Sequence, residues 1–252
     1  MKDYVKKYIR TIRLNSFHPL CETDIGQNAI ANFNFPPFID ASCRREPDLE
    51  HSFPSITALC RQEKFAPQLY PNDIVIYMTV KGKWFTDFEH YRIIAILEVI
   101  DRKERHLQAK SWYTSKGLTI PSNCMVDDNP PHPFLETAGR YEKQKDIKNF
   151  LAYSIEKQNI IGERIVTLWD KEYLEKSKKW GAFIITKPIF INLTNPPILT
   201  EQNIYNIFKK KINTRTPKKM TSIEFKELAK FTSINFIQPG GEFRQMPTDC
   251  KP

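Results

Sequence analysis

Two short apolar segments joined by a cationic loop constrain the fold of this chain most strongly. Residues 74–80 are rich in β-branched side chains, apolar at nearly every position and too few for a helix. They follow a Tyr-Pro-Asn-Asp sequence at residues 70–73 that favours a tight turn. Residues 91–100 have the same apolar character, and the loop between the two segments carries two lysines and a tryptophan. We therefore expect two strands that are buried on both faces or that belong to a barrel.

The other periodic segments predict an α+β protein. Residues 39–50 carry acidic and basic side chains and show neither a helical nor a strand periodicity, which predicts a surface loop. A lysine-rich helical insertion is expected at about residues 141–180, inside a barrel domain that spans residues 1–208 and precedes a basic C-terminal extension, residues 209–252. Further strands are expected at residues 8–14, 181–186 and 189–193, and helices at residues 24–33, 56–61, 103–117, 200–208 and 222–230.

Composition favours a cytoplasmic protein without a membrane span. No apolar run approaches the roughly 20 residues that a spanning helix needs, and the first 14 residues alternate basic and apolar side chains, unlike a signal peptide. The 5 cysteines include no Cys-x-x-Cys pair, which predicts reduced thiols. A zinc site built from Cys43, Cys60, Cys124 and a histidine is an alternative that lacks the usual ligand spacing. We expect no metal and no other cofactor.

Basic residues concentrate in the second half of the chain. Residues 1–140 hold 18 Lys/Arg and 17 Asp/Glu, whereas residues 141–252 hold 20 and 12. Most of the excess lies in one cluster, opposed there only by Glu224 and Glu227: Lys209, Lys210, Lys211, Arg215, Lys218, Lys219, Lys226 and Lys230. Such a cluster is typical of a protein that binds a polyanion. A solvated lysine-rich surface without a partner is the alternative.

The order of these segments resembles the PUA-like superfamily, which includes EVE, ASCH and YTH-type domains. The likeness is carried by the turn and strand of residues 69–77, by the strand of residues 93–99, and by residues 183–199, which look like the closing strands of that superfamily. Asn72 stands where the superfamily usually has glycine. Three further segments look like parts of bacterial proteins akin to nucleotide-modification-associated domains: residues 40–48, 54–61 and 121–125.

The resemblance implies a small mixed β-barrel with flanking helices, whose mouth receives a base turned out of its stack, often a modified one. It implies binding of nucleic acid, with DNA expected more than RNA, and a role in restriction, phage defence or base modification. Stacking aromatics and polar groups that read the base edge are expected in the pocket: Asp40, Ser42, Tyr77, Trp84, Tyr91, Trp112 and Asn123. Phosphate contacts are expected from Arg44, Arg45, Lys81, Lys83, Lys209, Lys210, Lys211, Lys218 and Lys219. Core packing is the alternative for each aromatic residue, and Trp84 is the strongest stacking candidate.

Two other classes of function remain open. A glycosylase or nuclease needs acids beside the bound nucleotide, and the candidates are Asp40, Glu46 and Asp48. The sequence has no phosphate-binding glycine loop, and no histidine lies in a recognisable motif with Ser122 or Cys124, so a binding protein is expected rather than an enzyme. An adaptor that binds an acidic protein through residues 209–230 would retain no nucleic acid even at low salt.

Overall fold

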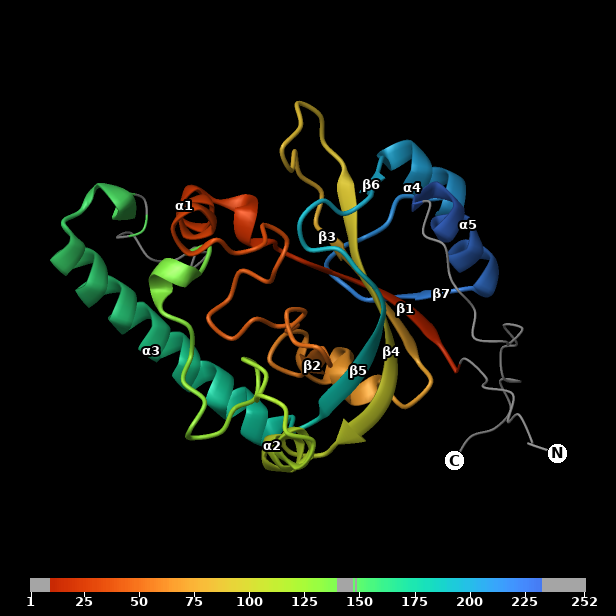
Figure 1. Cartoon of the computed structure of the whole chain (residues 1–252). Helices are drawn as coiled ribbons and strands as arrows, with labels where there is room; N and C mark the ends of the chain where they lie inside the picture. The colour runs from red at the N-terminus through yellow and green to blue at the C-terminus, as the bar shows by residue number, and fades with distance from the viewer. Residues whose placement is uncertain (1–9, 140–146, 148, 233–252) are drawn as a thin grey trace.

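A computed structural model of the chain describes residues 10–139, 147 and 149–232 as a mixed α+β protein (Figure 1). Its centre is a strongly curled sheet that forms a half-barrel, with the strand order β2-β5-β4-β3-β1-β7 and with β6 paired to β4. The sheet is mixed because β1 and β3 are parallel whereas the other pairs are antiparallel. The strands are β1 (Ile12–Phe17), β2 (Ser55–Thr57), β3 (Ile74–Thr79), β4 (Tyr91–Lys103), β5 (Phe183–Ile191), β6 (Ile198–Leu199) and β7 (Lys218–Met220). Since β2 and β7 end the order without pairing to each other, the expected barrel is realised only as a half-barrel.

Helices lie on both sides of this sheet, with α4 and α5 at one side and the long α3 at the other (Figure 1). None of the helices in the described part of the chain has the length and apolarity that crossing a membrane requires. The helices are α1 (Asp24–Phe33), α2 (His106–Ser115), α3 (Ile155–Lys179), α4 (Glu201–Phe208) and α5 (Ser222–Thr232), with short 3-10 turns at Leu20–Glu22, Gln62–Lys64, Ala66–Gln68, Phe134–Glu136 and Phe150–Ala152.

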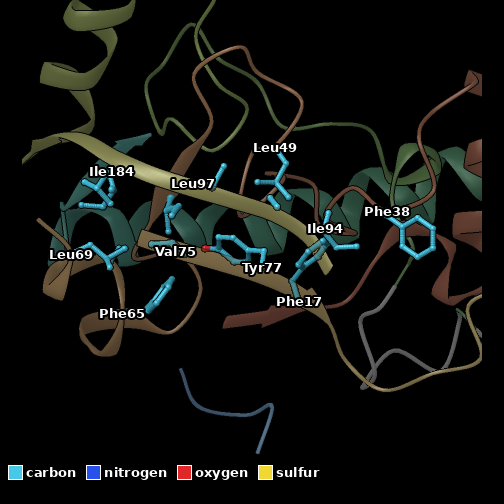
Figure 2. Packing of buried hydrophobic residues seen from close by; sticks show 14 of the residues in the cluster. Phe17, Phe38, Leu49, Phe65, Leu69, Val75, Tyr77, Ile94, Leu97 and Ile184 are labelled. Atoms are coloured by element: carbon cyan, nitrogen blue, oxygen red, sulfur yellow. The ribbon is translucent and has the colours of Figure 1, made fainter. Parts of the chain in front are cut away.

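The prediction of two strands buried on both faces is confirmed. All six residues of β3 are buried, and the alternation of side chains along a strand sends them into two cores. Val75 and Tyr77 lie in one core, which residues 38–69 cover and which Figure 2 shows from close by. There the Tyr77 ring meets Phe17 edge-on, with ring centres 6.0 Å apart.

The second core contains the side chains on the opposite face of β3, which pack against α4 and α5. Phe208, Phe225 and Leu228 are each at most 5 % exposed. Strand β7 also pairs with β1, with Ile12 opposite Met220. The described part of the basic extension therefore belongs to the same sheet and the same core as the N-terminal strand.

Several predicted elements are confirmed and others need correction. The helices expected at residues 24–33, 200–208 and 222–230 are present as α1, α4 and α5, and most of the helical insertion is α3. The helix expected at residues 56–61 is wrong, because β2 pairs there with β5. The two late strands are one strand, β5, whose register with β4 shifts at bulges. Strand β4 runs to Lys103, so α2 begins only at His106. Residues 8–9 of the expected first strand, residues 140–146 and 148 of the insertion region, and residues 233–252 of the basic extension lie outside the described residues.

Candidate nucleic-acid interface

The segment at residues 39–50 is not the surface loop that the sequence predicts. Five of its six charged residues, Asp40, Arg44, Arg45, Glu46 and Asp48, are each at most 8 % exposed, and only Glu50 at its end is exposed. A buried charge is tolerated only where hydrogen bonds or opposite charges compensate the loss of water. The segment is therefore an internal polar network, and its partners come from distant parts of the chain.

Both arginines predicted to contact phosphates are bonded to protein groups. Arg44 donates from Nε to Asp170 Oδ1 at 2.5 Å and from Nη1 to Asn129 O at 2.6 Å. Arg45 donates from Nη1 to Asp40 O at 2.9 Å and from Nη2 to Glu136 O at 2.7 Å. Neither guanidinium group faces solvent in this arrangement, so a phosphate contact would require these bonds to break.

The three predicted catalytic acids take part in the same network. Glu46 accepts from the Thr57 N–H at 2.9 Å, from Thr57 Oγ1 at 2.6 Å and from Asn123 Nδ2 at 2.9 Å. Asp48 Oδ2 accepts from the Ser122 N–H at 2.7 Å. Burial raises the pKa of Glu46 to about 8, against these hydrogen bonds, which lower it. The acids hold the loops of the half-barrel together, and Asn123, predicted to read a base edge, is one of their buried partners.

Asp40 differs from the other two acids. Its Oδ1 accepts from the Ser42 N–H, the Ser42 hydroxyl and the Glu46 N–H, at 2.9, 2.6 and 3.0 Å. Burial raises the pKa of Asp40, and its hydrogen bonds with Ser42 oppose that shift. Asp40 and Ser42 thus lie together, as expected for two pocket residues, but they form an Asx-type turn with each other.

The predicted stacking aromatics lie in three different cores. Tyr77 and Trp84 belong to the core on one face of the sheet, Tyr91 belongs to the core on the opposite face, and Trp112 lies on α2 and packs against Phe53. They therefore do not enclose one pocket in this structure. Only Trp112 is more than 8 % exposed.

Trp84, the strongest stacking candidate, is packed rather than exposed. Its Nε1–H donates to Val80 O at 3.0 Å, and Arg92 Nη2 donates to its carbonyl oxygen at 3.1 Å. The ring lies over Gly82, where an added Cβ would meet it at 2.4 Å. In the same loop Lys81 pairs with Glu89 at 2.7 Å, which leaves Lys83 as the exposed cation. Stacking of Trp84 on a base would require this loop to open.

The C-terminal basic cluster is the predicted site that the structure leaves open to solvent. Five cations of residues 209–219 are exposed, and none of them forms an ion pair with another described residue: Lys209, Lys210, Lys211, Arg215 and Lys219. Lys218 is partly buried and pairs with Glu224 at 2.7 Å. The five exposed cations, called the basic face below, extend from the end of α4 to β7 at the edge of the sheet.

Arg61 holds the middle of the basic face in place, a role that no local sequence pattern indicates. Its Nη2 donates to Ser16 O at 3.2 Å and to Thr214 O at 3.0 Å, and its Nη1 donates to Arg215 O. Arg61 itself adopts a left-handed backbone conformation, with φ of 67°. The loop that carries Arg215 is thereby tied to β1.

Two of the hollows in the described part of the chain are relevant to the predicted base pocket. One of about 380 Å³ lies between residues 131–135 and α3, with mostly apolar walls. The other, of about 10 Å³, lies between the end of β1 and residues 212–218 and has room for about one water molecule. None of the seven predicted base-pocket residues lines either hollow.

The cysteines in the described part of the chain do not belong to a metal site. No group of three or more His, Cys, Asp or Glu side chains there has the geometry to hold a metal ion. Cys43 and Cys124 are fully buried, whereas Cys60 is exposed.

Comparison of the chain with protein-family models, with curated proteins and with solved structures finds no match.

Proposed function

We propose that the protein binds nucleic acid through the basic face, with DNA preferred over RNA on the strength of the PUA-like resemblance. The observation that carries the proposal is the set of five exposed cations at residues 209–219 that have no acidic partner among the described residues. Lysine and arginine side chains in such a set gain binding free energy from contact with a phosphate backbone, because binding releases the counterions of the nucleic acid.

The anchoring of the basic face supports the proposal. Lys219 lies opposite Arg13 in the β1–β7 pair, and Arg61 holds the loop that precedes β7. Cations on a fixed backbone lose less conformational freedom on binding than cations on a free tail. A solvated lysine-rich surface would need no such anchoring.

Recognition of a turned-out base is the finer part of the proposal. The tight turn before β3 and the hairpin of β3 and β4 support a PUA-like relationship for the curled sheet. The 380 Å³ hollow beside α3 lies on the other side of the sheet from α4 and the basic face, and the ring of Trp84 is packed. Base recognition is therefore proposed from the resemblance and the curled sheet, without a site at either position. A role in restriction or phage defence rests on the resemblance alone.

The test compares two triple variants by fluorescence anisotropy with labelled oligonucleotides over a range of salt concentrations. Lys209→Glu, Lys210→Glu and Lys211→Glu together should weaken binding of every sequence and reduce the salt slope on duplex DNA by about 2 to 3, since each phosphate contact contributes about 0.9. The control has the same charge change at three other exposed lysines: Lys116, Lys171 and Lys187. Equal losses in the two triple variants, or no loss in the first, would refute the proposal.

A further inference from the structure

A chain of hydrogen bonds joins Ser122, His132 and Glu136. Ser122 Oγ lies 2.9 Å from His132 Nε2, and His132 Nδ1 lies 2.9 Å from Glu136 Oε2. The sequence shows no recognisable motif at these positions, and the folded chain nevertheless brings a histidine to Ser122. The two side chains meet only because residues 121–124 form a turn, with the Cys124 N–H donating to Pro121 O at 2.9 Å, beside the segment that carries His132.

The hydrogen bonds fix the state of the imidazole. A carboxylate only accepts, so the bond to Glu136 places the ring proton on Nδ1 and leaves the lone pair of Nε2 facing the Ser122 hydroxyl. Burial and the neighbouring Arg45 lower the pKa of His132, against the opposing effect of Glu136. The ring is therefore neutral at pH 7 and able to accept a proton from the serine.

Backbone contacts hold all three residues in place. The Ser122 N–H donates to Asp48 Oδ2 at 2.7 Å, the His132 N–H donates to Cys43 O at 2.8 Å, and Arg45 Nη2 donates to Glu136 O at 2.7 Å. The side chains remain accessible: 27 % of His132 and 22 % of Glu136 is exposed. A nucleophile, a base within hydrogen-bond reach and a third group that orients the base form the arrangement that activates a serine.

We propose that Ser122, His132 and Glu136 form a catalytic triad for acyl transfer, separate from the basic face. Ser122 Oγ forms a bond to the carbonyl carbon of an ester while its proton moves to His132 Nε2. The bond from that carbon to the leaving group then breaks, and His132 returns the proton to the leaving group. Water repeats the sequence on the acyl serine and releases the acid, so that one ester and one water give one acid and one alcohol or thiol.

The surroundings of Ser122 select the class of substrate. Its own N–H is bound to Asp48, and the next residue, Asn123, is fully buried, so neither N–H can donate to an oxyanion. One such donor is worth about 100-fold to 1000-fold in rate in serine hydrolases. Ester bonds with good leaving groups, such as aryl esters and thioesters, tolerate this loss, whereas amides do not. We therefore assign activated esters as the substrates.

A fluorophosphonate probe tests the proposal on the full-length protein without nucleic acid. Ser122 Oγ forms a bond to phosphorus, fluoride leaves, and the serine proton passes to His132. Mass spectrometry should find the adduct on Ser122 at pH 7.5. Ser122→Ala should abolish labelling, whereas Ser115→Ala, at an exposed serine of α2, should leave it unchanged. Absence of an adduct on Ser122 in folded wild-type protein would overturn the proposal, whether or not the basic face binds nucleic acid.

Two further variants separate catalysis from structure. His132→Gln keeps the serine and should slow labelling at least 100-fold, because it removes the general base. Glu136→Gln removes the carboxylate that supports the imidazolium, so the pH midpoint of the labelling rate should move downward. The triad would be refuted if Glu136→Gln kept both the melting temperature and the pH midpoint of labelling of wild type, because Glu136 would then have a structural role only.

Discussion

Glu46 should make the stability of the protein depend on pH in an unusual direction. Glu46 is 5 % exposed, and its carboxyl group accepts three hydrogen bonds, from the Thr57 N–H, the Thr57 hydroxyl and the Asn123 amide. Burial raises its pKa from 4.5 to about 8. Between these two values the folded protein keeps a proton that the unfolded chain releases. The contribution of Glu46 to stability is therefore full below pH 4.5 and is lost as the pH rises toward 8.

The size of this loss of stability follows from the interval between the pKa values of Glu46 in the unfolded chain and in the folded protein. At about 1.36 kcal/mol per pH unit, the wild-type protein should lose about 5 kcal/mol from this residue between pH 4.5 and pH 8. Glu46→Gln has no proton to lose and removes this slope. The amide accepts with one oxygen only, so at pH 5 the variant should be less stable than wild type by about 1 to 3 kcal/mol, the penalty for one unsatisfied buried donor.

Urea unfolding at pH 5, 6, 7 and 8.5, followed by circular dichroism, measures the difference between the two proteins. The difference isolates Glu46 because other titrating groups, such as His132, contribute to both. Glu63→Gln, at an exposed glutamate, serves as the matched control and should change nothing. The argument would be refuted if the wild-type and Glu46→Gln free energies of unfolding kept a constant difference across this range.

Two further substitutions test the packing around the proposed interface. Trp84→Ala should lower the free energy of unfolding by about 3 to 5 kcal/mol in urea titrations, because it empties a buried site, and should leave nucleic-acid affinity unchanged at a temperature where the variant is folded. A stable variant with affinity reduced tenfold or more would instead identify Trp84 as a stacking residue. Arg61→Ala should lower stability by about 1 to 3 kcal/mol and weaken nucleic-acid binding in anisotropy titrations, because it releases the loop that carries Arg215. Unchanged affinity would show that the anchoring of this loop is irrelevant to binding.

The sequence predicts those parts of the fold that local patterns determine. The β-branched run of β3 and the proline turn before it identify a buried strand, and the Thr200 cap marks the start of α4. Strand β2 has only three residues and depends on pairing with β5, more than 120 residues later in the chain. The hydrophobic periodicity of such a short segment does not indicate a distant partner strand, so the sequence of residues 56–61 resembles a short helix.

The burial of charged residues in the candidate site is not recorded in the local sequence. Arg44 and Arg45 look like surface residues because their partners are distant: Asp170 lies 126 positions from Arg44, and Glu136 lies 91 positions from Arg45. The same reason hides the contact between Ser122 and His132, which only the folded loops create. The basic cluster at residues 209–219 could be predicted because its signal is composition, which needs no knowledge of partners.

Lysine footprinting tests the central claim most directly, because it reports which cations nucleic acid covers. The protein is acetylated briefly with and without a saturating duplex oligonucleotide at low salt, and mass spectrometry gives the extent of modification at each lysine. The account predicts protection of Lys209, Lys210, Lys211 and Lys219, with no change at Lys116, Lys171 and Lys187. Equal modification of the first set with and without bound oligonucleotide, or protection confined to the second set, would contradict it.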